Sequence, residues 1–177
     1  RSMSASHTDT GGYNSCVNPV EGAQGRLQQA ARAMLAQCTG GHEYYRGLRG
    51  PVLRRAAYCI NRVRSGDRVS PYFSAWGKQF VWGPDEHVFG TRCLFRTNGH
   101  EREKLESLGE VGVWVGKNVD SNQHWVIPIH WDPIDKRFVL EPMKSVVTVR
   151  VFDDQFPLRC LPEGRGEPDL VKFNNFI

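Results

Sequence analysis

The first half of the chain carries apolar residues at the spacing of an α-helix. The first apolar stripe falls on Leu27, Ala30, Ala31, Met34 and Leu35. Gly40 and Gly41 follow it and predict the end of a helix. A second stripe begins after Gly50-Pro51 and falls on Val52, Leu53, Ala56, Ala57, Ile60 and Val63. Because short helices are marginal alone, we expect the two to pack together as a hairpin over residues 26–64.

The polar positions of this predicted hairpin are strongly basic. Eight arginines and one acidic residue, Glu43, lie between Arg26 and Arg64. Such asymmetry indicates an anionic partner, although a solvated basic face without a partner is the alternative. On the second helix the polar residues are expected to face away from the core. The candidate contacts to a nucleic-acid backbone are Arg32, Arg54, Arg55, Arg62 and Arg64.

The second half of the chain changes to the alternating pattern of β-strands. Residues 65–88 precede it and read as a linker anchored by aromatic side chains. Five short strands are then predicted at residues 89–96, 111–116, 124–129, 137–141 and 146–152. Five strands in so short a stretch favour a small closed barrel of the SH3-like or OB type over residues 89–154, because closure removes exposed edges.

The predicted fold class is therefore α+β: an N-terminal helical hairpin followed by a five-stranded SH3-like barrel. Residues 1–25 are polar and lack apolar periodicity, so they are expected to be an extended tail. Residues 155–177 contain scattered Pro and Gly and are expected to be a C-terminal tail. No apolar run approaches the roughly 20 residues of a membrane-spanning helix.

Several short motifs, taken in order, resemble the C-terminal part of the integrase in copia-type (Pseudoviridae-like) retrotransposon polyproteins. The similarity runs from about Asn18 to Asp154. The motifs that carry it are Ala31-Arg32-Ala33-Met34-Leu35, Ala57-Tyr58-Cys59-Ile60-Asn61-Arg62, Ser70-Pro71-Tyr72 with Trp76-Gly77-Lys78, Val88-Phe89-Gly90, Lys104-Leu105 with Val113-Trp114-Val115-Gly116, and Asp132-Pro133 with Val149 to Asp154. The resemblance implies the end of an integrase catalytic core followed by a small barrel, and contact with DNA.

The same resemblance puts the last catalytic glutamate of the family at Glu21. The residues that usually follow that glutamate are replaced here by Gly22-Ala23-Gln24-Gly25. Integrases of this kind use three carboxylates to hold two divalent metal ions. The two family aspartates would lie before Arg1, and Asp9 is too close to Glu21 to replace one. The chain alone is therefore expected to hold no metal and to be inactive; Mg²⁺ or Mn²⁺ would bind only together with an upstream core.

The cysteines, histidines and tryptophans limit the other interpretations. The five cysteines are widely spaced without a C-x-x-C pair, which favours a reducing compartment over a disulfide framework or a cysteine zinc site. An active retroelement protein would place that compartment in the nucleus or cytoplasm. His124 and His130 are interpreted as packing or surface residues. At least two of Trp114, Trp125 and Trp131 are expected in the barrel core, and the alternative is a face for bases or another protein.

Three functional hypotheses follow. The first is an integrase-derived fragment that binds the backbone of DNA or RNA. The second is a domesticated, non-enzymatic subunit of a larger protein complex, in which the basic faces bind an acidic protein surface, RNA or lipid headgroups. The third is a free-standing SH3-like adaptor, which leaves the long basic helical half unexplained and is ranked last.

Overall fold

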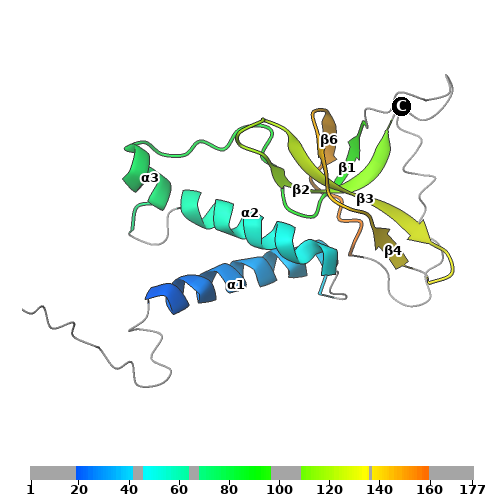
Figure 1. Ribbon diagram of the computed structural model, residues 1–177, viewed down its shortest axis with the longest axis horizontal. Helices are drawn as coiled ribbons and strands as arrows, with labels where there is room; N and C mark the ends of the chain where they lie inside the picture. The colour runs from blue at the N-terminus through cyan, green and yellow to red at the C-terminus, as the bar shows by residue number, and fades with distance from the viewer. Residues whose placement is uncertain (1–18, 42–45, 64–67, 97–108, 136, 160–177) are drawn as a thin grey trace, which may run out of the picture.

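The computed structural model describes residues 19–41, 46–63, 68–96, 109–135 and 137–159. Within these ranges the chain is α+β: a layer of helices lies against one six-stranded antiparallel sheet (Figure 1). Of the tails predicted over residues 1–25 and 155–177, residues 1–18 and 160–177 lie outside the described residues, whereas Leu158 is buried in the core.

Four helical segments precede the sheet. They are α1 (Pro19–Thr39), the 3-10 helix η1 (Arg46–Leu48), α2 (Arg49–Arg62) and α3 (Pro71–Trp76). Helices α1 and α2 lie side by side and run in opposite directions (Figure 1). Helix α1 begins inside the segment predicted to be an extended tail. Pro19 at its start and Glu21 in its first turn favour a helix N-terminus there.

Helix α3 lies within the segment 65–88 that was interpreted as a linker. Ser70 caps it: the Ser70 hydroxyl accepts a hydrogen bond of 3.1 Å from the backbone N–H of Phe73. Pro71 occupies the first turn, and Gly77 ends the helix in the left-handed conformation at φ 66°. The segment therefore carries its own start and stop signals, although it is only one and a half turns long.

The sheet follows the predicted alternation closely, with one strand more than expected. Its strands are β1 (Arg92–Phe95), β2 (Glu110–Lys117), β3 (His124–Asp132), β4 (Arg137–Leu140), β5 (Lys144–Val146) and β6 (Val149–Phe152). The single strand predicted at residues 146–152 is instead divided between β5 and β6. These two strands pair with different partners, β3 and β1 respectively.

The strand order is β4-β3-β2-β1-β6, and β5 pairs with β3 outside this path. All described pairs are antiparallel. Strands β4 and β6 occupy opposite ends of the path, and no pairing among the described residues joins them. The prediction of a closed barrel was therefore wrong for the described part of the chain: the sheet is open.

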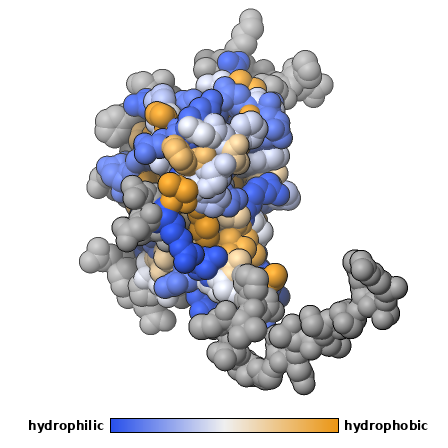
Figure 2. Space-filling view, turned by 90° about the vertical axis from the view of Figure 1, so that its left-hand side faces the viewer, coloured by the Kyte–Doolittle hydropathy of each residue, from blue (hydrophilic) through white to orange (hydrophobic). Residues whose placement is uncertain are grey.

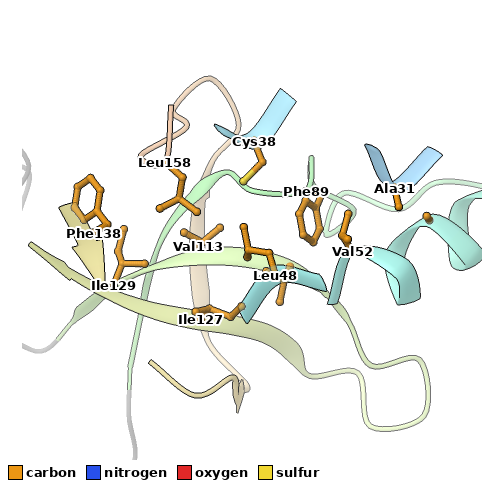
Figure 3. Packing of buried hydrophobic residues seen from close by; sticks show 12 residues of the cluster. Ala31, Cys38, Leu48, Val52, Phe89, Val113, Ile127, Ile129, Phe138 and Leu158 are labelled. Atoms are coloured by element: carbon orange, nitrogen blue, oxygen red, sulfur yellow. The ribbon is translucent and has the colours of Figure 1, made fainter. Parts of the chain in front are cut away.

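Both faces of the sheet are packed. The larger cluster joins the helices to one face and includes Leu48, Val113 and Ile127, which lie close together in Figure 3. The residues next to them in β2 and β3, Trp114 and Val126, point to the opposite face, as strand geometry requires. That smaller cluster consists of Cys93, Phe95, Trp114, Val126 and Val146. The larger cluster thus fixes the helices on one face of the sheet, and the smaller cluster fills the other face.

The contact between the end of α1 and the start of the sheet depends on a glycine. Gly90 has φ +87°, and a Cβ at this position would lie 2.3 Å from the Cys38 Sγ atom and 2.5 Å from the Cys38 Cβ atom. No side chain fits in that space, and the left-handed backbone favours glycine as well. The Cys38 thiol faces the Gly90 carbonyl oxygen at 4.0 Å. At this point the end of α1 packs directly against the backbone of Gly90, just before β1.

Candidate functional site

One face of α2 carries two arginines on either side of a tyrosine. Arg55, Tyr58 and Arg62 are spaced by three and four residues, which places them on the same side of the helix. The rings around them form a continuous aromatic cluster, whose neighbouring centroids are 5.1 to 6.4 Å apart. We define the aromatic cluster as Tyr58, Tyr72, Trp76, Phe80 and Trp82. It joins α2 to α3 and to the segment that leads into the sheet.

Arg55 is buried, which corrects the prediction that it faces solvent. Its guanidinium forms a 2.8 Å ion pair with Glu86 and donates to the His87 carbonyl oxygen at 3.1 Å. The Tyr58 hydroxyl donates to the same carboxylate at 2.5 Å. Burial, followed by the hydrogen bond to Glu86, raises the pKa of Tyr58 to about 12, so the phenol remains protonated. Arg55 thus anchors α2 to the segment before β1 and offers no free charge at the surface.

Arg62 is half-buried against the aromatic cluster. Its guanidinium carbon lies 3.5 Å from the Tyr58 ring centroid and 4.9 Å from that of Phe80, within the range of cation–π attraction. One terminal N–H donates to the Tyr58 carbonyl oxygen at 3.2 Å. The Nε atom is buried and has no hydrogen-bond acceptor among the described residues. Arg62 also lines a cavity of about 300 Å³ beside α3.

The remaining predicted basic residues differ in their placement. Arg54 is exposed, and its guanidinium carbon lies 5.6 Å from the Trp125 ring centroid. Both residues line a cavity of about 40 Å³ between α2 and the sheet. Arg32 is exposed on α1. Arg64 lies outside the described residues.

The described surface from η1 to the end of the aromatic cluster carries charge of one sign. Residues 46–63 and 68–82, which we call the basic segment, contain seven basic side chains and no acidic one. Five of the seven are exposed and form no ion pair with another described residue; they are Arg46, Arg49, Arg54, Arg68 and Lys78. Cations without nearby carboxylates create a positive potential that attracts anionic partners. The basic segment is therefore the strongest candidate for a binding surface.

Glu21, the predicted family glutamate, is exposed in the first turn of α1. Across the described ranges no group of three or more His, Cys, Asp or Glu side chains is arranged to hold a metal ion. Glu21 therefore belongs to no such group in the part of the chain that the structure describes.

A second polar group surrounds the Trp114 ring and was not predicted as a unit. The indole N–H of Trp114 donates to the Nδ1 atom of His124 at 3.2 Å, and the His87 ring lies edge-on to Trp114. Burial and then the charge of Lys117 lower the pKa of His124. The neutral ring is the form that accepts this hydrogen bond. His124 thus acts as a packing residue, as interpreted, while His130 is exposed.

Sequence reasoning missed Glu86, which organises both Arg55 and Tyr58. No local pattern distinguishes Glu86 from its exposed neighbour Asp85, because the pairing joins positions 31 residues apart. Of the three tryptophans considered for the core, Trp114 is fully buried, and Trp125 and Trp131 pack against the main cluster while partly exposed. Trp114 is therefore a core residue, whereas Trp125 and Trp131 lie at the margin of the main cluster.

Of the helices that the structure describes, none is both long and apolar enough to span a membrane. No protein-family model, curated protein or solved structure matches the chain.

Proposed function

We propose that this chain is a nucleic-acid-binding module derived from a copia-type retrotransposon integrase. One observation carries the proposal: over the described residues 46–63 and 68–82 the basic segment contains seven basic side chains, five of them exposed, and no carboxylate. The motifs that occur in the family's order between Asn18 and Asp154 support the same assignment. In this proposal α1 and α2 act as a helical hairpin that presents the cations to the phosphate backbone.

The exposed arginines of α2 and its flanks would form the phosphate contacts. Arg46, Arg49 and Arg54 extend over η1 and α2, and Arg32 adds a cation on α1. Phosphate contacts supply affinity and position without selecting a sequence. Arg55 is left out of this interface because its charge is neutralised by Glu86 inside the protein. Glu21 would serve as a metal ligand for Mg²⁺ or Mn²⁺ only together with aspartates from an upstream core.

The test is binding to a short DNA duplex measured by fluorescence anisotropy across a salt series. Each neutralised phosphate contributes about −0.9 to the slope of log K against log salt. The double variant R49Q/R54Q is expected to make that slope shallower by about two. The matched control R96Q/R150Q removes the same charge from exposed arginines of the sheet half and is expected to leave the slope unchanged. An equal loss in both variants would refute a specific role for the basic segment.

The second candidate is a non-enzymatic subunit of a larger protein complex. Apolar side chains exposed around α3 favour it, because such patches often mark protein interfaces. They are Val63, Val69, Phe73, Trp76 and Val81. Absence of binding to duplex and to single-stranded DNA even at low salt would reject the nucleic-acid proposal and leave this candidate in its place.

A further inference from the structure

The cavity of about 300 Å³ beside α3 has no role in the proposed duplex binding and can receive a separate ligand. Its size is at the lower end of the range for small-ligand pockets. It is lined by residues of α2, α3 and the following segment, among them Arg62, Ser70, Phe73, Gln79, Phe80 and Trp82. Figure 2 views the molecule from the α3 side and shows strongly hydrophobic and strongly hydrophilic residues next to one another on this face.

The walls of this cavity combine flat rings with hydrogen-bonding groups. Phe73 is 36% exposed and Trp82 is 44% exposed, so both retain ring surface for a ligand. Gln79 contributes an amide with both donors and acceptors. The buried Ser70 hydroxyl accepts from Phe73, and its own proton has no acceptor among the described residues. Rings for stacking and polar groups for base edges are the features by which proteins bind unpaired bases.

The charge of the cavity selects an anionic ligand. Arg62 lines the cavity and has no carboxylate partner within the described residues. Arg68 and Lys78 add exposed cations nearby in the chain, and no acidic residue occurs in residues 68–82. An aromatic ligand that carries negative charge fits these requirements.

We propose that this cavity receives an unpaired base of a single-stranded nucleic acid, with the adjacent phosphate close to Arg62. This inference rests on the proposed function and adds to it a preference for single strands over duplex. In a duplex the bases are stacked and paired, so they cannot enter the cavity. The smaller cavity beside Trp125, at about 40 Å³, has room for a few water molecules only and is not part of the proposal.

The first experiment uses the full chain and three 12-nucleotide DNA probes measured by fluorescence anisotropy. The probes are an oligothymidine, an oligonucleotide of the same length made of abasic units, and a duplex. Since the abasic strand keeps the phosphates and lacks the bases, the unmodified protein is expected to bind it roughly tenfold more weakly than oligothymidine. Equal affinity for the two single strands would overturn the base-pocket proposal.

Single substitutions locate the base. F73A and W82L are each expected to weaken oligothymidine binding by about tenfold while changing duplex binding less than twofold. The matched control is W76L. Trp76 lies in α3 with Phe73, is 69% exposed and does not line the cavity. W76L is expected to leave both affinities within twofold.

The outcomes separate the two proposals. Duplex binding with salt dependence, together with F73A and W82L that behave like W76L, would overturn the pocket and leave the proposed function standing. No binding of any probe at low salt would overturn both. Circular dichroism of each variant shows whether it folds, and the abasic comparison needs no variant at all.

Discussion

The helical half and the sheet half of this molecule differ in how they treat charge. In the sheet half, both lysines whose side chains are described have carboxylate partners: Lys117 pairs with Asp85 at 2.9 Å, and Lys144 pairs with Glu110 at 3.4 Å and with Glu141 at 3.5 Å. In the basic segment, Arg55 alone has a carboxylate partner among the described residues, and Glu86 comes from outside the segment. The sheet half thus provides carboxylates for its lysines, whereas the basic segment has no carboxylate of its own for its cations.

The single ion pair that joins the basic segment to a carboxylate is also the most deeply buried. Arg55 and Glu86 side chains are 7% and 9% exposed, whereas Asp85, the neighbour of Glu86, is 56% exposed in its pair with Lys117. Glu86 and Asp85 are adjacent and form ion pairs of nearly equal length, yet the first pair is buried and the carboxylate of the second is exposed. Burial, rather than distance, decides how much each pair contributes.

The largest expected effect is therefore that of E86Q. The substitution leaves the Arg55 charge buried without its counter-charge, which is expected to lower the free energy of unfolding by about 3–5 kcal/mol. Urea denaturation followed by tryptophan fluorescence measures this change. The matched control D85N removes an exposed partner and is expected to change stability by less than about 1 kcal/mol. Equal losses would mean that burial does not separate the two pairs.

A smaller effect is expected where the two halves touch. G90A places a methyl group against Cys38 at a backbone of φ +87°, and strain with overpacking is expected to lower stability by at least about 2 kcal/mol. G77A supplies the control, because Gly77 has φ +66° with no atom within 4 Å of an added Cβ. It is expected to lose only the conformational part, about 1 kcal/mol. Thermal denaturation of both variants isolates the steric part of the contact.

The smallest expected effect is a pH dependence within the sheet half. Because burial lowers the folded-state pKa of His124, the unfolded chain takes up the proton first. The stability from neutral His124 is therefore fully present above the ordinary histidine pKa of about 6.5 and declines as pH falls below it. H124Q is expected to reduce this decline in urea denaturation over that window. H130Q removes an exposed histidine and is expected to leave it unchanged.

The sequence predicted the elements of this fold better than their closure. Alternation located the strands because each side of the sheet faces a core, as Val113 and Trp114 show by entering different clusters. Local pattern carries no information about which strands meet at the sheet edges, so the open order was not predictable. Helix α3 was predictable: Ser70, Pro71 and Gly77 form cap signals that the dense aromatic residues around them obscured.

The candidate site was predicted only in composition. An arginine on a helix is expected to face solvent, and this held for Arg54, but Arg55 turns inward because Glu86 meets it from a distant segment. Arg62 keeps a free donor because its neighbours are rings rather than carboxylates. Helical spacing gave the positions of these residues, and only tertiary contacts separated the structural cation from those available to a partner.

The thiol of Cys38 is enclosed where α1 meets Gly90, so its reactivity reports when the helical layer separates from the sheet. Burial raises the pKa of Cys38 to about 12, and the thiolate is the form that reacts with alkylating reagents. At neutral pH, Cys38 is therefore expected to be alkylated only after the helices separate from the sheet. Cys93, buried within β1 with its pKa also raised to about 12, waits until the sheet itself opens. Peptide mass spectrometry measures the alkylation rates of Cys38 and Cys93 separately. The first rate reports separation of the helices from the sheet, and the second reports unfolding of the sheet.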